Sequence, residues 1–193
     1  MTSQEINKLI GVSESYKAPD RMMEIVLMTD TAQRNAIYSS FMTAFGYDDS
    51  YEWFNDYFED EHADRKGKKQ DFTPKSIGKT LSGIIGSQKG IMYEPAAGNG
   101  SLIISKWNDD RLACDPFEYL PSDHVYVCCE LSDRSVPFLL FNMAIRGMMG
   151  VVYHGNALTG KYKEAYTVVN DANSPVSFSS VYKLSDERPD LFN

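Results

Sequence analysis

The chain has 193 residues, of which 42% are hydrophobic and 24% charged, and its formal net charge is −8. This length suits one domain with a real core, and the composition excludes a chain that is disordered throughout. The acidic balance excludes a protein that grips nucleic acid through phosphate contacts over its whole surface. Any role on nucleic acid is therefore expected to need a local basic patch or a partner.

The cysteines and the first residues of the sequence indicate the cellular compartment in which the protein is expected. Cys114, Cys128 and Cys129 have no metal-type spacing, so buried free thiols are predicted. The sequence starts without a basic stretch and an apolar signal core, and no apolar run approaches the roughly 18 residues of a membrane span. We expect a cytoplasmic protein without membrane contact.

Residues 1–70 are predicted to form a helical N-terminal segment. Apolar side chains recur at helical intervals over residues 20–46, which predicts one long helix or two abutting helices with Asp20 as N-cap. The acidic and aromatic residues 47–63 predict a shorter helix. The basic run at 64–70 is expected to be a solvated connector, and the alternative is a phosphate contact beside a DNA cleft.

From residue 71 to residue 193 the pattern changes to alternating strands and helices. The predicted strands cover residues 90–94, 124–130, 151–156 and 165–169, with a short strand-like run at 178–184. The predicted helices cover residues 75–85, 101–108 and 133–149. This alternation is typical of an α/β fold with a parallel sheet and crossover helices.

A glycine loop between the first strand and its helix is the strongest chemical signal. The segment Glu94-Pro-Ala-Ala-Gly-Asn-Gly100 leads to a helix that starts at Ser101. Gly98 and Gly100 can adopt positive φ and let a ligand approach the backbone, and the free N–H groups of the helix face the same place. Glu94 would repel a pyrophosphate but could accept hydrogen bonds from an ammonium group. S-adenosylmethionine (SAM) carries such a group, so the loop, with Pro95, Ala96 and Asn99, predicts a SAM site.

Two further polar side chains end the next two strands. In open parallel sheets ligands bind at the carboxyl ends of the strands. Glu130 could accept both ribose hydroxyl protons of the cofactor, and the Asn156 amide oxygen could accept from its adenine amine. We predict one site from these residues, their neighbours Leu131 and Ala157, and the glycine loop.

These motifs together resemble a known family. The segments DFTP at 71–74, YEPAAGNGSL at 93–102, CELS at 129–132 and HGNAL at 154–158 look like the successive cofactor motifs of N6-adenine DNA methyltransferases. The likeness is to modification subunits of type I restriction systems and to related small phage or mobile-element proteins, and it covers about residues 71–170.

The resemblance implies a fold and roles for individual residues. It implies a Rossmann-like class I SAM-dependent methyltransferase fold. In the family, the residues matching Thr73 and Pro74 help hold the SAM carboxylate, and the loop wraps the methionine part. The acid matching Glu130 binds ribose, whereas the position matching Asn156 is usually Asp.

The segment after the fourth predicted strand departs from the family. Such enzymes carry Asn-Pro-Pro-Phe or Asp-Pro-Pro-Tyr there, but this chain has Val169-Asn-Asp-Ala-Asn-Ser-Pro175, and none of its eight prolines adjoins another. Asn170 occupies the place of the first catalytic residue and could offer its amide oxygen to an adenine amine, without the rigid Pro-Pro geometry. The 23 residues after Asn170 also predict a sheet that is shortened at the C-terminus. The segment Asp115-Pro-Phe-Glu-Tyr119 superficially resembles the missing motif, but it precedes the second predicted strand and is predicted to be a loop.

Two functions from different classes remain open. The first is a SAM-dependent DNA adenine-N6 methyltransferase that meets DNA with a partner subunit. The second is a catalytically lapsed fold kept as a SAM-binding or protein-interaction module of a phage or mobile element, with a protein partner or a second copy. The cofactor motifs favour the first, whereas the acidic charge and the missing motif favour the second. A protein that binds no SAM is a third alternative, and the scattered histidines predict no metal site.

Overall fold

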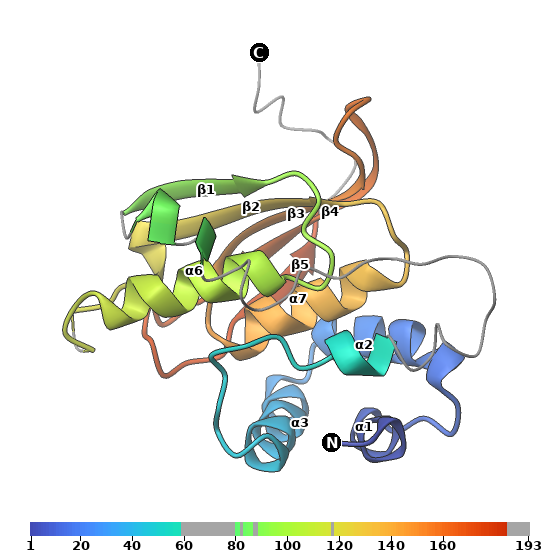
Figure 1. Ribbon diagram of the computed structural model, residues 1–193. Coiled ribbons are helices and arrows are strands. Elements are labelled where there is room, and N and C mark those ends of the chain that lie inside the picture. The colour runs from blue at the N-terminus through green and yellow to red at the C-terminus, as the bar shows by residue number, and fades with distance from the viewer. Residues whose placement is uncertain (59–79, 82, 87–88, 117, 185–193) are drawn as a thin grey trace.

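The computed structural model describes residues 1–58, 80–81, 83–86, 89–116 and 118–184. Within these ranges the chain forms three layers, in which a sheet lies on two helices and these lie on the N-terminal helices (Figure 1). The described parts of the chain contain no helix that is long and apolar enough to cross a membrane.

The N-terminal segment begins with three helices and a 3-10 turn. These are α1 (Ser3–Ile10), η1 (Ser15–Lys17), α2 (Ala18–Val26) and α3 (Thr31–Ala44). The predicted apolar repeat over residues 20–46 therefore corresponds to two helices. Asp30 caps α3, since its side chain accepts from the Gln33 N–H at 3.0 Å. The prediction that Asp20 is an N-cap is wrong, because α2 already begins at Ala18 and Asp20 lies in its first turn.

Other predicted elements fall partly outside the described residues. Residues 55–58, 80–81 and 83–85 are helical, and they are the described helical parts of the helices predicted at 47–63 and 75–85. The basic run at 64–70 lies outside the described residues. The division of the chain at residue 70 stays a prediction.

The sheet contains every strand that the sequence predicts. The strands are β1 (Gly90–Glu94), β2 (His124–Glu130), β3 (Met149–Asn156), β4 (Lys161–Val169) and β5 (Ser180–Lys183), in the order β1-β2-β3-β4-β5. The first three are parallel, as predicted. β4 is antiparallel to β3, and β5 is antiparallel to β4, so a parallel fourth strand is a wrong prediction. Residues 157–160 form a hairpin turn, and a parallel connection would need a dozen or more residues.

Two crossover helices lie on one face of the sheet. They are α6 (Ser101–Leu112) and α7 (Ser135–Ile145), and the short η2 (Pro121–Asp123) precedes β2. α6 is longer than predicted. α7 is shorter, because Gly147 turns the chain at φ +65° and β3 starts at Met149.

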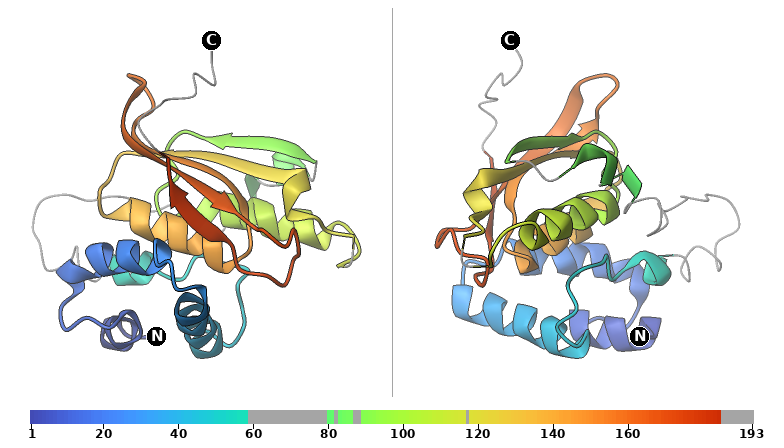
Figure 2. Two further views of the ribbon diagram at one scale, coloured as in Figure 1. Left: turned by 180° about the vertical axis from the view of Figure 1, so that it is seen from behind. Right: turned by 60° about the vertical axis from the view of Figure 1, so that its left-hand side comes forward.

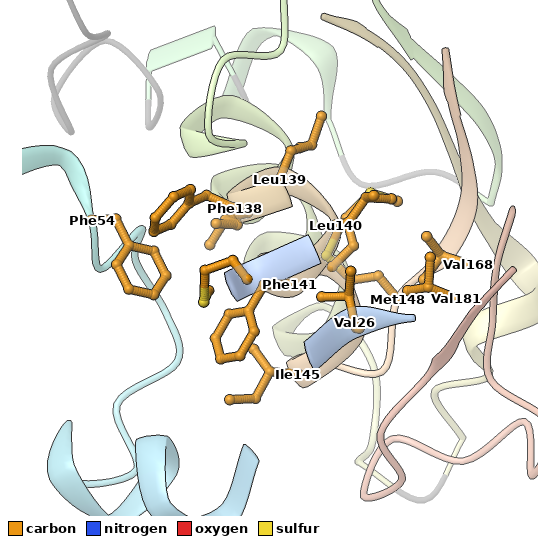
Figure 3. Close-up of a cluster of buried hydrophobic side chains, with 14 of the residues drawn as sticks. Val26, Phe54, Phe138, Leu139, Leu140, Phe141, Ile145, Met148, Val168 and Val181 are labelled. Atoms are coloured by element: carbon orange, nitrogen blue, oxygen red, sulfur yellow. The ribbon is translucent and has the colours of Figure 1, made fainter. Parts of the chain in front are cut away.

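Every residue of α7 is buried, which explains why apolar side chains surround its whole circumference. Toward the N-terminal layer Phe141 and Phe138 contact Phe54, with ring centroids 5.8 and 4.9 Å apart (Figure 3). Toward the sheet its side chains share one cluster with Val168 and Val181. The N-terminal segment and the sheet therefore meet in a continuous core that has α7 at its centre.

The two faces of the sheet differ in cover. Figures 1 and 2 show α6 and α7 beneath the sheet, and no described helix lies over its other face. Ile91 and Tyr93 are exposed on β1, whereas Cys128 and Cys129 of β2 are buried free thiols, as predicted. Cys114 is half-buried and also free.

Candidate functional site

The carboxyl ends of β1, β2 and β3 lie at one edge of the sheet because these strands are parallel. β1 ends at Glu94 and β2 ends at Glu130, which stands opposite His154 of β3. The loop after β1 and the connection from β2 to α7 are found at the same end in Figure 1. The structure thus brings Glu94, the glycine loop and Glu130 together, as the sequence predicts.

The glycine loop, residues 95–100, is folded over the end of β2. The Ala97 N–H donates to the Cys129 carbonyl at 3.0 Å. Gly98 and Gly100 have φ values of +56° and +99°. A Cβ at Gly100 would come within 3.1 Å of the Leu139 side chain, whereas one at Gly98 would meet nothing within 4 Å. Gly100 therefore packs closely against α7, and Gly98 borders open space.

Glu130 ties this loop to the start of the next connection. Its Oε2 accepts from the Gly98 N–H and its Oε1 from the Ser132 N–H, both at 2.7 Å. Each carboxylate oxygen has a second lone pair, so the group can still accept two protons from a ligand. The next residue, Leu131, is exposed at the rim.

Glu94 is a half-buried acid at the end of β1. Burial raises the pKa of its carboxyl above the ordinary value, and a hydrogen bond from the Ala96 N–H, at 3.3 Å, acts in the opposite direction. Glu94 lines a cavity of about 360 Å³ that runs along β1 and is bordered by Lys106 of α6 and His124 of β2. Pro95 and Ala96 are exposed beside it.

Asn99 connects the loop to the interior. Its backbone carbonyl accepts from the Asn142 side chain at 2.8 Å. Its own side chain is buried, and neither amide atom has a hydrogen-bond partner among the described residues. At the next turn the Asn55 amide donates to the Ser101 hydroxyl at 3.1 Å, which joins the N-terminal segment to the start of α6.

A buried polar cluster behind the loop is absent from the sequence prediction. Glu52 accepts from the Asn142 side chain at 2.9 Å, and Arg146 donates to the Asn142 amide oxygen at 2.8 Å. Burial raises the pKa of Glu52 to about 7 and lowers that of Arg146 to about 10. One polar side chain in the apolar run 136–145 is a signal that could have identified Asn142.

A charged rim beside Glu130 is also missing from the prediction. The His154 Nε2 lies 2.9 Å from the Asp133 carboxylate, and the Lys163 ammonium lies 2.5 Å from the same oxygen. The hydrogen bond from Lys163 is the main reason why the pKa of Asp133 is lowered. Residues from the β2–α7 connection, β3 and β4 thus meet here, because β4 runs back beside β3 and places Lys163 next to His154.

Asn156 closes that hairpin. Its side-chain oxygen accepts from the Leu158 N–H at 2.9 Å and from the Thr159 N–H at 3.3 Å, and Ala157 lies within the turn. The oxygen that is expected to meet an adenine amine is thus engaged by the chain's own backbone.

Asn170 lies at the opposite end of the sheet from the glycine loop. It follows β4, which runs antiparallel to β3. The side-chain nitrogen donates to the carbonyls of Gly147, Ser174 and Ser177 at 3.0, 2.9 and 3.0 Å. The predicted topology that would place Asn170 beside the loop is therefore wrong.

Two predicted ligands, Thr73 and Pro74, lie outside the described residues. Within the residues that are described, no three His, Cys, Asp or Glu side chains gather in a way that could hold a metal ion. Segment 115–119 contains neither helix nor strand in its described part, in agreement with the predicted loop.

A family model described as N-6 DNA Methylase matches residues 44–188, which is most of the chain. No curated protein and no solved structure matches significantly. The matched span contains Glu52, the glycine loop, Glu130 and Asn142.

Proposed function

The chain belongs to the N-6 DNA methylase family, and from this premise we propose that it binds SAM at the glycine loop and serves adenine-N6 methylation of DNA. The family supports a methyltransferase function in general. The resemblance to N6-adenine DNA methyltransferases is thereby confirmed, whereas a type I modification-subunit identity stays a proposal.

Glu130 is the observation that carries the cofactor assignment. It is buried at a carboxyl strand end, and its two oxygens already bracket the loop and the β2–α7 connection. Its remaining lone pairs suit the two hydroxyls of a ribose. The exposed Leu131 offers an apolar surface beside it.

The rest of the site suits the amino-acid part of the same ligand. Glu94 can accept from an ammonium, which would offset the burial that raises its pKa. The open space at Gly98 lets a ligand reach the backbone. Thr73 and Pro74 are proposed to hold the carboxylate, and Asn99 has an unpartnered amide that a ligand could use. SAM, when bound, supplies the electrophilic methyl group of its sulfonium.

The proposed fold assignment is Rossmann-like class I. The connections through α6 and α7 give two successive parallel strand–helix–strand units, β1-α6-β2 and β2-α7-β3. The antiparallel β4 and β5 extend the sheet on the far side of β3.

The proposed DNA substrate needs a partner subunit. A net charge of −8 disfavours a large phosphate-contacting surface, and an adenine must leave the base stack to reach a methyl group. Asn170 is engaged at the far end of the sheet, so the group that would hold the adenine amine is unassigned in this chain. That observation favours the second candidate function, a lapsed methyltransferase fold acting as a SAM-binding or protein-interaction module, alone or as a homo-oligomer.

The setting is proposed from the same resemblance. A restriction-modification system, or a phage or mobile element, in the cytoplasm would supply both DNA and partner subunits.

Calorimetric titration with SAM tests the cofactor assignment. We expect the wild type to bind and Glu130→Ala to lose at least a hundredfold in affinity, because hydrogen bonds to a charged group would be lost. Asp30→Ala is the matched control, since it also removes a carboxylate that accepts from a backbone N–H, but at the start of α3. Equal affinity of Glu130→Ala and wild type would refute the assignment.

A further inference from the structure

Asn142 lies between the glycine loop and the N-terminal segment. It belongs to α7 and is fully buried. One side-chain N–H donates to the Asn99 carbonyl at 2.8 Å and the other to the Glu52 carboxylate at 2.9 Å. Both protons of the amide are therefore used, and each joins α7 to a segment distant in sequence.

The second partner, Glu52, is held in its place by its own segment. The Phe54 N–H donates to both Glu52 oxygens at 2.9 Å. The nearby Phe54 ring packs on Phe138 of α7 (Figure 3). Glu52 is thus a fixed acceptor against which Asn142 is oriented.

Arg146, one turn after Asn142, clamps the same segment. It donates to the carbonyls of Asp49 and Tyr51 at 2.8 and 2.6 Å and to the Asn142 amide oxygen at 2.8 Å. Because that oxygen accepts from Arg146, the Asn142 nitrogen must face Glu52 and the loop. The orientation of the amide is therefore determined by its hydrogen bonds.

We propose that Asn142 and Glu52 are positioning residues, which fix the glycine loop through the Asn99 carbonyl so that residues 49–55 of the N-terminal segment control ligand affinity. The inference rests on the proposed function for the identity of the ligand, SAM. Loss of the Asn142 amide would leave the buried Asn99 carbonyl, near the end of the loop, without this donor. The loop would then have to move, and with it the Gly98 N–H that reaches Glu130.

Protonation of Glu52 is a natural way to weaken this bridge. The groups that face its carboxylate from α7 are Asn142 and the cation Arg146, and Asp49 approaches Arg146 from the N-terminal segment. The hydrogen-bonding neighbours of Glu52 are all donors, so the ionised carboxylate holds them best. Its pKa is about 7, so its charge changes between pH 6 and pH 8.

The first test compares two buried asparagines by hydrogen exchange without ligand. Asn142→Ala is expected to speed amide exchange in residues 95–101 at least tenfold relative to wild type. Asn170→Ala is the matched control, since it also removes a buried amide that donates to backbone carbonyls, but at the other end of the sheet. Under conditions where both variants stay folded, it should leave exchange through local opening in residues 95–101 unchanged.

The second test measures SAM affinity of the same proteins and of Glu52→Gln. Asn142→Ala should bind at least tenfold more weakly than wild type, and Asn170→Ala equally well. Wild-type affinity should rise at least threefold from pH 6 to pH 8 relative to Glu52→Gln, which keeps a neutral side chain of the same shape. Titration of SAM itself affects both proteins alike and cancels in this ratio.

The outcomes separate the inference from the proposed function. Faster loop exchange in Asn142→Ala with no SAM binding by wild type would refute the ligand and support the positioning role. Unchanged loop exchange, or wild-type SAM affinity in Asn142→Ala, would overturn the inference. If Asn142→Ala does not fold, equal pH dependence in wild type and Glu52→Gln would overturn it instead.

Discussion

The loops that follow β1 and β4 contain similar residues but lie at opposite ends of the sheet. The glycine loop at 95–100 follows a strand that is parallel to its neighbour, whereas the loop at 170–179 follows an antiparallel one. Each is held by a buried asparagine, Asn142 or Asn170. The comparison shows that the direction of a strand decides at which end of the sheet the following loop lies, and so whether that loop can join the candidate site beside Glu130.

The manner of support differs as well. Asn142 holds the glycine loop from behind, so the open side at Gly98 remains available to a ligand. Asn170 belongs to its own loop and uses its side chain on the loop's own carbonyls and on Gly147. The support of the first loop leaves one side of it open, whereas the second loop is closed on itself.

The largest expected effect concerns the second loop. Asn170→Ala should lower the free energy of unfolding by about 3 to 4 kcal/mol, because the buried Gly147 carbonyl and the partly buried carbonyls of Ser174 and Ser177 lose their donor. Urea denaturation measures this loss. A catalytic or ligand-binding role would instead require stability near wild type with weakened binding.

Glu52 makes the support of the glycine loop sensitive to pH, whereas Asn170 cannot ionise. The folded-state pKa of about 7 lies above the usual value of 4.5, so the native state binds the proton more tightly. The cost of burying the ionised carboxylate outweighs the hydrogen bonds that it accepts, so stability should fall by about 3 kcal/mol as pH rises from 4.5 through 7, and this group should add little further change above about pH 8. Glu52→Gln should remove that part of the pH dependence in denaturation experiments. Parallel stability curves for the two proteins would contradict it.

Gly100 and Gly160 test how tightly the glycine loop is packed. Both have positive φ, but a Cβ at Gly100 meets Leu139 at 3.1 Å, and one at Gly160 meets nothing within 4 Å. We expect Gly100→Ala to destabilise the protein by about 2 kcal/mol and Gly160→Ala by about 1 kcal/mol. Equal thermal shifts for the two variants would show that the contact with α7 is unimportant.

The smallest expected effect is at the charged rim. Lys163→Ala removes an ion pair to Asp133, whose side chain is 72% exposed. Such pairs contribute little, so stability should change by less than about 0.5 kcal/mol. A larger change in the melting temperature would show that this ion pair helps to hold β4 against the β2–α7 connection.

The part of the candidate site that could be predicted is the part that is encoded in short, continuous stretches of sequence. The β1 strand, the glycine loop and Glu130 each follow from residues that are close together in the chain, and parallel strand ends bring them to one edge. The family resemblance came from the same residues and is confirmed over 44–188.

The direction of β4 was harder to predict. A strand pattern does not indicate the direction of the strand; the local feature that does is the short turn between Asn156 and Lys161, where Gly160 has φ +63°. Asn-x-x-x-Gly is a turn signal that favours a hairpin over a crossover. A hairpin at this place puts Asn170 at the opposite end of the sheet from the glycine loop.

The bridge through Asn142 depends on tertiary contact. Glu52 and Asn142 are 90 residues apart, and Glu52 resembles an ordinary surface acid in an acidic segment. Its burial results from the packing of Phe54 and Phe138, which no local pattern displays. The local feature that points to this bridge is the polar Asn142 within the apolar run 136–145.

Hydrogen exchange of the wild type with and without SAM tests the central claim most directly, because a ligand slows exchange at its own site. The predicted result is protection in residues 94–101 and 130–132 and unchanged exchange in residues 170–179. Protection confined to residues 170–179, or none at either end at saturating SAM, would contradict the claim that the glycine-loop end of the sheet is the cofactor site.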